Sequence, residues 1–297
     1  MKRKVILLTI SSVLLLTSCH LFTKENNQDE KKDDIIIESK EDTSTSQNEV
    51  LPNLGTWWWG KNLDVNEYIS FAKENNITEI YYCNYELNGN IHSLLDTAKK
   101  NNMNVYLLLG EKDWLEDRKS LDSLITNYIN FQNENDNPFS GIHLDIEPHQ
   151  FKDFKEKREK YLYSLVDLIK TNKDTYPSIN FDYDIPFWLD DVIEYNNQSK
   201  ETYKHIIDYA NRTFLMSYRD TADKMYDVSK EEIEYAIENN KIVYLGAETY
   251  SEEGDQVSYL EEGKQYMYQE LNKLRGMIPS NFGISIHHIE QWKKIKD

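Results

Sequence analysis

Short apolar runs and longer amphipathic segments alternate along the chain from residue 51 onward. Eight runs rich in β-branched, aromatic and aliphatic residues predict strands at 54–59, 78–85, 104–109, 141–147, 178–185, 213–218, 241–248 and 282–287. Segments of helical period lie between them, at 64–75, 91–102, 121–133, 151–170, 200–211, 230–239 and 259–274. Asn pairs such as Asn75-Asn76 end several of these helices, because Asn tolerates the left-handed cap conformation.

This alternation of strands and helices predicts an α/β fold with parallel strands joined by helical crossovers. Eight such units within residues 51–297 match the size of a (β/α)8 TIM barrel, which is typically about 250 residues. A doubly wound open sheet is the alternative. Trp57-Trp58-Trp59-Gly60 occupies the place where that fold carries its Gly-rich phosphate loop, and the ten glycines form no phosphate-binding cluster. We therefore expect a barrel and no nucleotide cofactor.

The first nineteen residues have the layout of a secretory signal. Three basic residues are followed by an apolar stretch of about a dozen residues, which is shorter than the roughly 20 needed to span a membrane. The segment ends in Leu16-Thr17-Ser18-Cys19, which resembles the lipobox of bacterial lipoproteins. This resemblance implies a signal peptide at 1–18 and a lipid on Cys19. A cleaved signal with an incidental cysteine is the alternative.

Residues 19–50 are rich in Lys, Asp, Glu, Asn, Ser and Thr, and they predict a disordered spacer between the lipidated Cys19 and the domain at 51–297. We therefore expect an extracytoplasmic monomer anchored to the cell membrane. The formal net charge of −18 disfavours nucleic acid as a partner, because phosphate binding needs a basic surface. The high aromatic content, with 21 Tyr, 10 Phe and 6 Trp, indicates a folded domain.

The fourth predicted strand carries the most informative side chains. Strand alternation in 141–147 places Ile142, Leu144 and Ile146 on one face, and on the other face it places His143, Asp145 and Glu147. The carboxyl ends of the strands form the active site in a TIM barrel, so this polar face is expected to point into the barrel and toward its mouth. Two acids two residues apart in partial burial raise one pKa, which is how an enzyme keeps a carboxyl group protonated.

The stretch 140–147 resembles the fourth-strand signature of glycoside hydrolase family 18, Asp-Gly-x-Asp-x-Asp-x-Glu. Asp145 matches the last Asp and Glu147 the catalytic acid, while Ser140 and His143 replace the first two acids. The run Met216-Ser217-Tyr218-Arg219 is similar to the family's Met-x-Tyr-Asp, with Arg219 in place of the Asp. The resemblance implies a glycosidase on a (β/α)8 barrel, in which Glu147 protonates the glycosidic oxygen and Asp145 orients an acetamido group of the substrate.

A second carboxylate offers another mechanism. Glu248 ends the seventh predicted strand, and an acid there facing Glu147 resembles the retaining glycosidases of clan A. In that clan the seventh-strand acid is the nucleophile, and the two carboxyl groups lie about 5 to 5.5 Å apart. The sequence leaves both mechanisms open.

Other strand ends supply residues suited to a carbohydrate groove, since sugar rings stack on aromatic faces and bond to polar side chains. The predicted substrate-binding residues are Trp57, Trp59, Tyr82, His143, Asp182, Asp184, Trp188, Arg219 and His287.

Two other function classes remain open from the sequence. A metal-dependent hydrolase would use His143, Asp145, Glu147, Asp182 and His287 as ligands, but no His-x-His or Cys/His ligand spacing is present, and we expect no metal. A non-catalytic glycan-binding lipoprotein on a glycosidase scaffold is favoured by the replaced family acids. We expect a membrane-anchored glycoside hydrolase that acts on a polysaccharide or wall glycan, with Glu147 as general acid.

Overall fold

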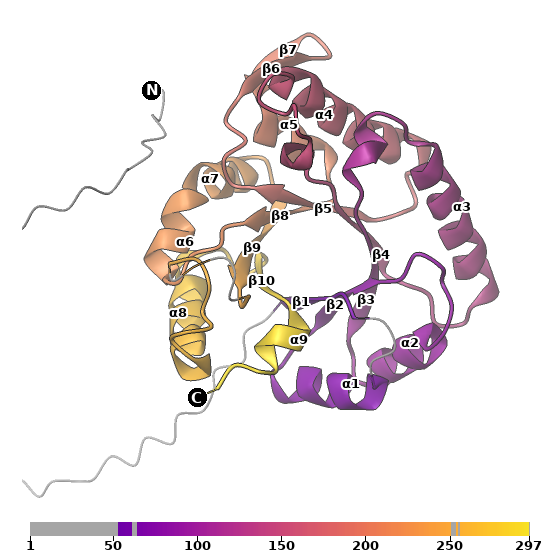
Figure 1. Ribbon diagram of the computed structural model, residues 1–297, viewed down its shortest axis with the longest axis vertical. Helices are drawn as coiled ribbons and strands as arrows, with labels where there is room; N and C mark the ends of the chain where they lie inside the picture. The colour runs from indigo at the N-terminus through magenta and orange to yellow at the C-terminus, as the bar shows by residue number, and fades with distance from the viewer. Residues whose placement is uncertain (1–52, 61–63, 251–253, 255, 297) are drawn as a thin grey trace, which may run out of the picture. The chain divides into compact units, whose positions relative to one another are not determined.

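The computed structural model describes residues 53–60, 64–250, 254 and 256–296, and Asn48–Asp297 form one compact unit. Eight parallel strands close into a barrel with helices around it (Figure 1), which confirms the predicted (β/α)8 fold. In barrel order the strands are β1 (Leu54–Trp58), β2 (Glu79–Cys83), β3 (Asn104–Leu109), β4 (Gly141–Asp145), β5 (Phe181–Pro186), β8 (Arg212–Met216), β9 (Ile242–Glu248) and β10 (Gly283–His287). The predicted signal peptide, Cys19 and the spacer lie outside the described residues.

Seven of the helices lie in segments that the sequence pattern predicts to be helical. The helices are α1 (Val65–Glu74), α2 (Ile91–Lys100), α3 (Lys119–Glu134), α4 (Arg158–Thr175), α5 (Thr202–Tyr209), α6 (Ala222–Val228), α7 (Lys230–Glu238), α8 (Lys264–Met277) and α9 (Ile289–Trp292). Short 3-10 turns lie at Lys112–Leu115 and Pro148–Gln150. Asn76, Asn102 and Asn240 follow three helices with φ of 56°, 58° and 53°, which confirms the Asn-based helix ends. No helix in these described ranges is long and apolar enough to cross a membrane.

The fold departs from the sequence prediction in the middle of the chain. The helix predicted at 151–170 begins only at Arg158, and the Phe151 ring stacks on Tyr161 of that helix at 4.1 Å instead of continuing it. A hairpin, β6 (Val192–Tyr195) and β7 (Gln198–Glu201), turns at Asn196 and Asn197, whose φ angles are positive. The predicted helix at 200–211 therefore begins after the hairpin, at Thr202. The short helices α6 and α9 were also not predicted.

An ion network fills the amino-terminal end of the barrel interior. The Arg212 guanidinium donates to both oxygens of Glu79 at 2.8 and 2.9 Å, and to Asp182 at 2.5 and 3.0 Å. The Tyr81 and Tyr244 hydroxyls also donate to Glu79, at 3.0 and 2.9 Å. Every carboxylate oxygen at this end therefore has a protein donor. Asp182, predicted to bind substrate, belongs to this network, and its position does not support that role.

Aromatic side chains pack directly above this network, around the buried imidazole of His143. The Tyr81 ring stacks on it with centroids 4.3 Å apart, and Phe214 and Trp57 meet it edge-on at 4.6 and 5.8 Å. Below the mouth at its carboxyl end, the barrel interior is therefore filled with packed side chains.

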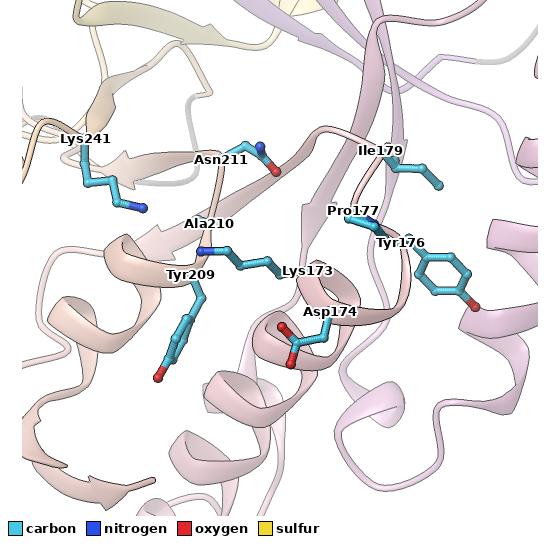
Figure 2. A pocket seen from close by; sticks show the side chains of 9 residues that line it. All are labelled: Lys173, Asp174, Tyr176, Pro177, Ile179, Tyr209, Ala210, Asn211 and Lys241. Carbon is cyan, nitrogen blue, oxygen red and sulfur yellow. The ribbon is translucent and has the colours of Figure 1, made fainter. Parts of the chain in front are cut away.

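A cavity of about 510 Å³ lies at the opposite end of the barrel from that mouth, between α4, α5 and the start of β9 (Figure 2). Two of its lining residues, Lys173 and Lys241, donate to the main-chain oxygen of Asp208 at 3.1 and 2.7 Å. That oxygen belongs to the last turn of α5, so the two lysines cap the negative end of this helix.

Candidate active site

Polar side chains from five neighbouring strands meet at the carboxyl end of the barrel. Strand register places Asp145 of β4 beside Asp184 of β5, and Glu248 of β9 beside His287 of β10. Tyr218 follows β8 between these two pairs. The inward face of each strand therefore contributes one polar group to the mouth. The aliphatic face of β4 packs into the helix layer, as the alternation predicted.

Asp184 is a nearly fully buried carboxyl group of the mouth, with 3% of its side chain exposed. Its Oδ2 accepts the Trp57 indole N–H at 3.0 Å and lies 2.7 Å from His143 Nε2. Its Oδ1 is buried, as is Oδ1 of Asp145, and neither has a hydrogen-bond partner among the described residues. Two buried carboxyl oxygens at the carboxyl end of the barrel are therefore left without a donor among the described residues.

Burial and mutual repulsion set the protonation of this aspartate pair. Burial raises the pKa of Asp145 well above its ordinary value, and the charges of Asp184 and Glu147 raise it further. Burial likewise raises the pKa of Asp184, against the Trp57 hydrogen bond, which lowers it. Burial lowers the pKa of His143 to about 3, so this imidazole is neutral. Burial therefore favours the protonated form of both aspartates, and the raised pKa predicted for one acid of the fourth strand falls on Asp145.

Glu147 lies two residues beyond Asp145, and 20% of its side chain is exposed. Gln150 donates a hydrogen bond to its Oε2, and His149 Nε2 lies 3.9 Å from its Oε1. Both partners come from the 3-10 turn that Pro148 begins, so the Glu-Pro sequence fixes the carboxylate at the rim. Sequence reasoning missed Gln150 and His149, although both follow Glu147 within three residues.

On the opposite wall, Glu248 and His287 form a bonded pair. Glu248 Oε1 accepts the main-chain N–H groups of Thr249 and Tyr250 at 2.7 and 2.8 Å, and Oε2 lies 2.9 Å from His287 Nδ1. The Trp59 indole N–H donates to His287 Nε2 at 3.1 Å. Since an indole can only donate, Nε2 is the acceptor and the proton of His287 lies on Nδ1.

Burial lowers the pKa of His287, but the hydrogen bond and charge of Glu248, with the charges of Asp145 and Asp184, outweigh it and raise this pKa. The imidazole is therefore a stronger base than an ordinary histidine.

Two glycines allow neighbouring groups of the site to pack closely against the backbone. A Cβ on Gly110 would lie 2.3 Å from the Asp145 main-chain oxygen, and one on Gly246 would lie 2.8 Å from the Tyr218 ring. Tyr85 donates to the Gly110 oxygen at 3.0 Å, and burial raises the pKa of this tyrosine to about 12. Burial also raises the pKa of Tyr218 well above 10, with the surrounding carboxylates adding to it, so this hydroxyl keeps its proton.

The predicted aromatic residues and Arg219 fall into three groups according to their position in the barrel. Trp57 is 2% exposed, and its indole N–H positions Asp184. Tyr82 packs outward against Trp58, with ring centroids 5.3 Å apart. Neither ring therefore offers an open face to a sugar. Trp59 is partly exposed at the mouth. Trp188 and Arg219 follow β5 and β8 in loops. The Arg158 guanidinium lies 4.9 Å from the Trp188 ring, and that of Arg219 lies 4.8 Å from the Phe187 ring.

The metal-ligand set considered from the sequence is not brought together. No group of three or more His, Cys, Asp or Glu side chains in the described ranges is placed to hold a metal ion. Asp182 is bound by Arg212 at the far end of the barrel, and His143 is bound to Asp184.

No protein-family model matches the sequence, and no curated protein matches it. Solved structures with a similar fold include three from different organisms. The spore cortex-lytic enzyme SleL of Bacillus megaterium QM B1551 has 14% identity and a TM-score of 0.47, over 82% of this chain and 72% of that one. A GH18 chitinase of Cycas revoluta in complex with (GlcNAc)3 has 10% identity and a TM-score of 0.47, over 80% and 95%. A Toxoplasma gondii ME49 protein described as a deoxyribose-phosphate aldolase has 9% identity and a TM-score of 0.49, over 82% and 92%. At this level the likeness concerns the barrel and carries no argument about activity.

Proposed function

We propose that this protein is a glycoside hydrolase that acts outside the cytoplasm and is anchored to the membrane through a lipid on Cys19. The arrangement that carries the proposal is a partly exposed Glu147 close to Asp145, which in turn lies beside the buried Asp184 on the neighbouring strand. Acid-catalysed cleavage of a glycosidic bond needs a carboxyl group that reaches the leaving oxygen and is supplied with a proton. Glu147 is partly exposed, and burial raises the pKa values of the two neighbouring aspartates, which favours their protonated forms.

In this mechanism Glu147 donates its proton to the glycosidic oxygen as the bond to the anomeric carbon breaks. Because burial raises the pKa of Asp145, this neighbour is less readily ionised, and it therefore repels the developing negative charge on Glu147 less than an ordinary aspartate would. The unpartnered oxygens of Asp145 and Asp184 accept hydrogen bonds from the sugar in the mouth. Tyr218, which keeps its proton, donates its hydroxyl hydrogen to the sugar from the neighbouring strand end.

The test is turnover of wall fragments and amino-sugar polymers by residues 48–297, with products identified by mass spectrometry. Glu147→Gln keeps the shape of the side chain but cannot donate a proton to the leaving group, so kcat is expected to fall by about 10²- to 10⁴-fold. Glu156→Gln, which changes an exposed acid outside the mouth, is the matched control and keeps full activity. Unchanged kcat in Glu147→Gln would refute the acid role. Glycan binding without turnover in the parent protein would support the non-catalytic alternative instead.

A further inference from the structure

Glu248 lies in a position that disfavours its use as a nucleophile. It is 2% exposed, Oε1 already accepts two main-chain N–H groups, and Oε2 is bonded to His287. A nucleophilic carboxylate must present an oxygen to the anomeric carbon, whereas this one faces a histidine and the backbone. These contacts of Glu248 are typical of a carboxylate that orients an imidazole and stabilises its charged form.

His287 presents the lone pair of Nε2, which accepts the Trp59 indole N–H, to the mouth. Because Nδ1 carries the proton and is held by Glu248, Nε2 is the basic atom, and 24% of the side chain is exposed. The Trp59 N–H that now donates to Nε2 marks the direction from which an incoming O–H would donate. The titratable groups that face this imidazole are Glu248 on β9, Asp145 on β4, Asp184 on β5, Tyr218 after β8 and His288 after β10.

The barrel order separates His287 from Glu147 as widely as the fold allows. Three strands lie between β4 and β10 in either direction around the barrel, so the two groups stand on opposite walls of the mouth (Figure 1). A glycosidase that inverts configuration needs an acid on one side of the sugar ring and a base for water on the other.

We propose that His287 is the general base of this site and that Glu248 is its positioning residue, so that hydrolysis proceeds with inversion. This inference rests on the proposed glycosidase function. A water molecule displaces the Trp59 N–H from Nε2, transfers a proton to Nε2 and attacks the anomeric carbon. The glycosidic bond breaks at the same time, and the leaving oxygen takes the proton of Glu147. The imidazolium then returns its proton to solvent and Glu147 regains one.

The experiment uses the full chain and combines product stereochemistry with pH profiles of kcat/KM. Proton NMR of the first product is expected to show the inverted anomer. His287→Gln is expected to lower kcat/KM by about 10²- to 10⁴-fold and to remove the fall in activity at acidic pH, which reports protonation of the base. Glu248→Gln is expected to lower kcat/KM less than His287→Gln does. It is also expected to move the fall in activity at acidic pH, the acidic limb of the profile, to lower pH, because the carboxylate that raises the pKa of His287 is gone. His92→Gln, on the exposed face of α2, is the matched control and leaves the profile unchanged.

The outcomes separate the two proposals. A retained anomer, or an acidic limb that is unchanged in both His287→Gln and Glu248→Gln, overturns the base role while the glycosidase function stands. A shift of the limb in Glu248→Gln cannot arise from a purely structural defect, which would lower activity equally at every pH. Absence of hydrolysis by the parent chain on every glycan overturns the glycosidase function, and the base role with it.

Discussion

Replacing Arg212 by Met tests the assignment of the amino-terminal end of the barrel as a structural network. The guanidinium makes four hydrogen bonds to Glu79 and Asp182, whose side chains are 8% and 1% exposed. Met keeps much of the apolar stem but leaves both carboxylates without their cation. Removing one partner of a buried ion pair typically costs about 3–5 kcal/mol, because the remaining charge stays buried and uncompensated.

The same loss can be estimated from protonation. A stranded carboxyl group escapes its buried charge by binding a proton, which at pH 7 costs about 4 kcal/mol for a group whose ordinary pKa is near 4. At pH 5 that cost is only about 1.4 kcal/mol. The folded variant then binds more protons than its unfolded chain, so its stability falls as pH rises. We therefore expect a loss of about 3–5 kcal/mol at pH 7 and roughly 2–3 kcal/mol less at pH 5.

The assay is urea unfolding of residues 48–297, followed by tryptophan fluorescence at both pH values. Lys160→Met is the matched control, since Lys160 and Glu116 form a pair with side chains 53% and 47% exposed and such pairs contribute at most about 1 kcal/mol. Adding Asp182→Asn and Glu79→Gln to Arg212→Met removes the stranded charges and should recover part of the loss. A loss below 1 kcal/mol at pH 7, or one of equal size at both pH values, would refute the reasoning.

Two further predictions concern the mouth and the anchor. Burial raises the pKa of Asp145, so the folded state holds a proton that the unfolded chain releases above about pH 4, and stability falls as pH rises from there toward the folded pKa. Asp145→Asn is therefore expected to unfold at higher urea than the parent at pH 8 but not at pH 4, and to lose activity; a lower midpoint at pH 8 would contradict this. Cys19→Ala is expected to move the protein from the detergent phase to the aqueous phase, and unchanged partitioning would argue against lipidation.

The barrel was predictable because parallel strands buried on both faces have a distinct sequence pattern. The run at 141–147 differs from this pattern because it alternates, and its alternation separated the helix-facing Ile and Leu residues from His143, Asp145 and Glu147. The hairpin at 192–201 was missed because its apolar positions are few, with Ile193 and Tyr195 buried but Val192 60% exposed. Its Asn196-Asn197 turn was a usable signal for two antiparallel strands.

Alternation predicts the face on which a side chain lies but not its height along the barrel axis. Asp182 and Asp184 share the inward face of β5, yet one bonds to Arg212 at the amino-terminal end and the other lies at the mouth. The orientation of the three consecutive tryptophans at 57–59 was also not predictable, because composition alone does not say which of them faces the helices. The structure places Trp58 against Tyr68 in the helix layer, with centroids 4.9 Å apart.

Carboxyl groups occupy both ends of this barrel interior, and their hydrogen bonding distinguishes a structural end from a functional one. At the amino-terminal end, Arg212 and two tyrosines satisfy every oxygen of Glu79 and Asp182, so nothing is left for a ligand to bind. At the mouth, Asp145 and Asp184 each retain a buried oxygen without a protein donor in the described residues. An unsatisfied buried acceptor costs stability, and the fold tolerates that cost where a bound molecule supplies the missing donor. The carboxyl end is for this reason the place to look for the substrate.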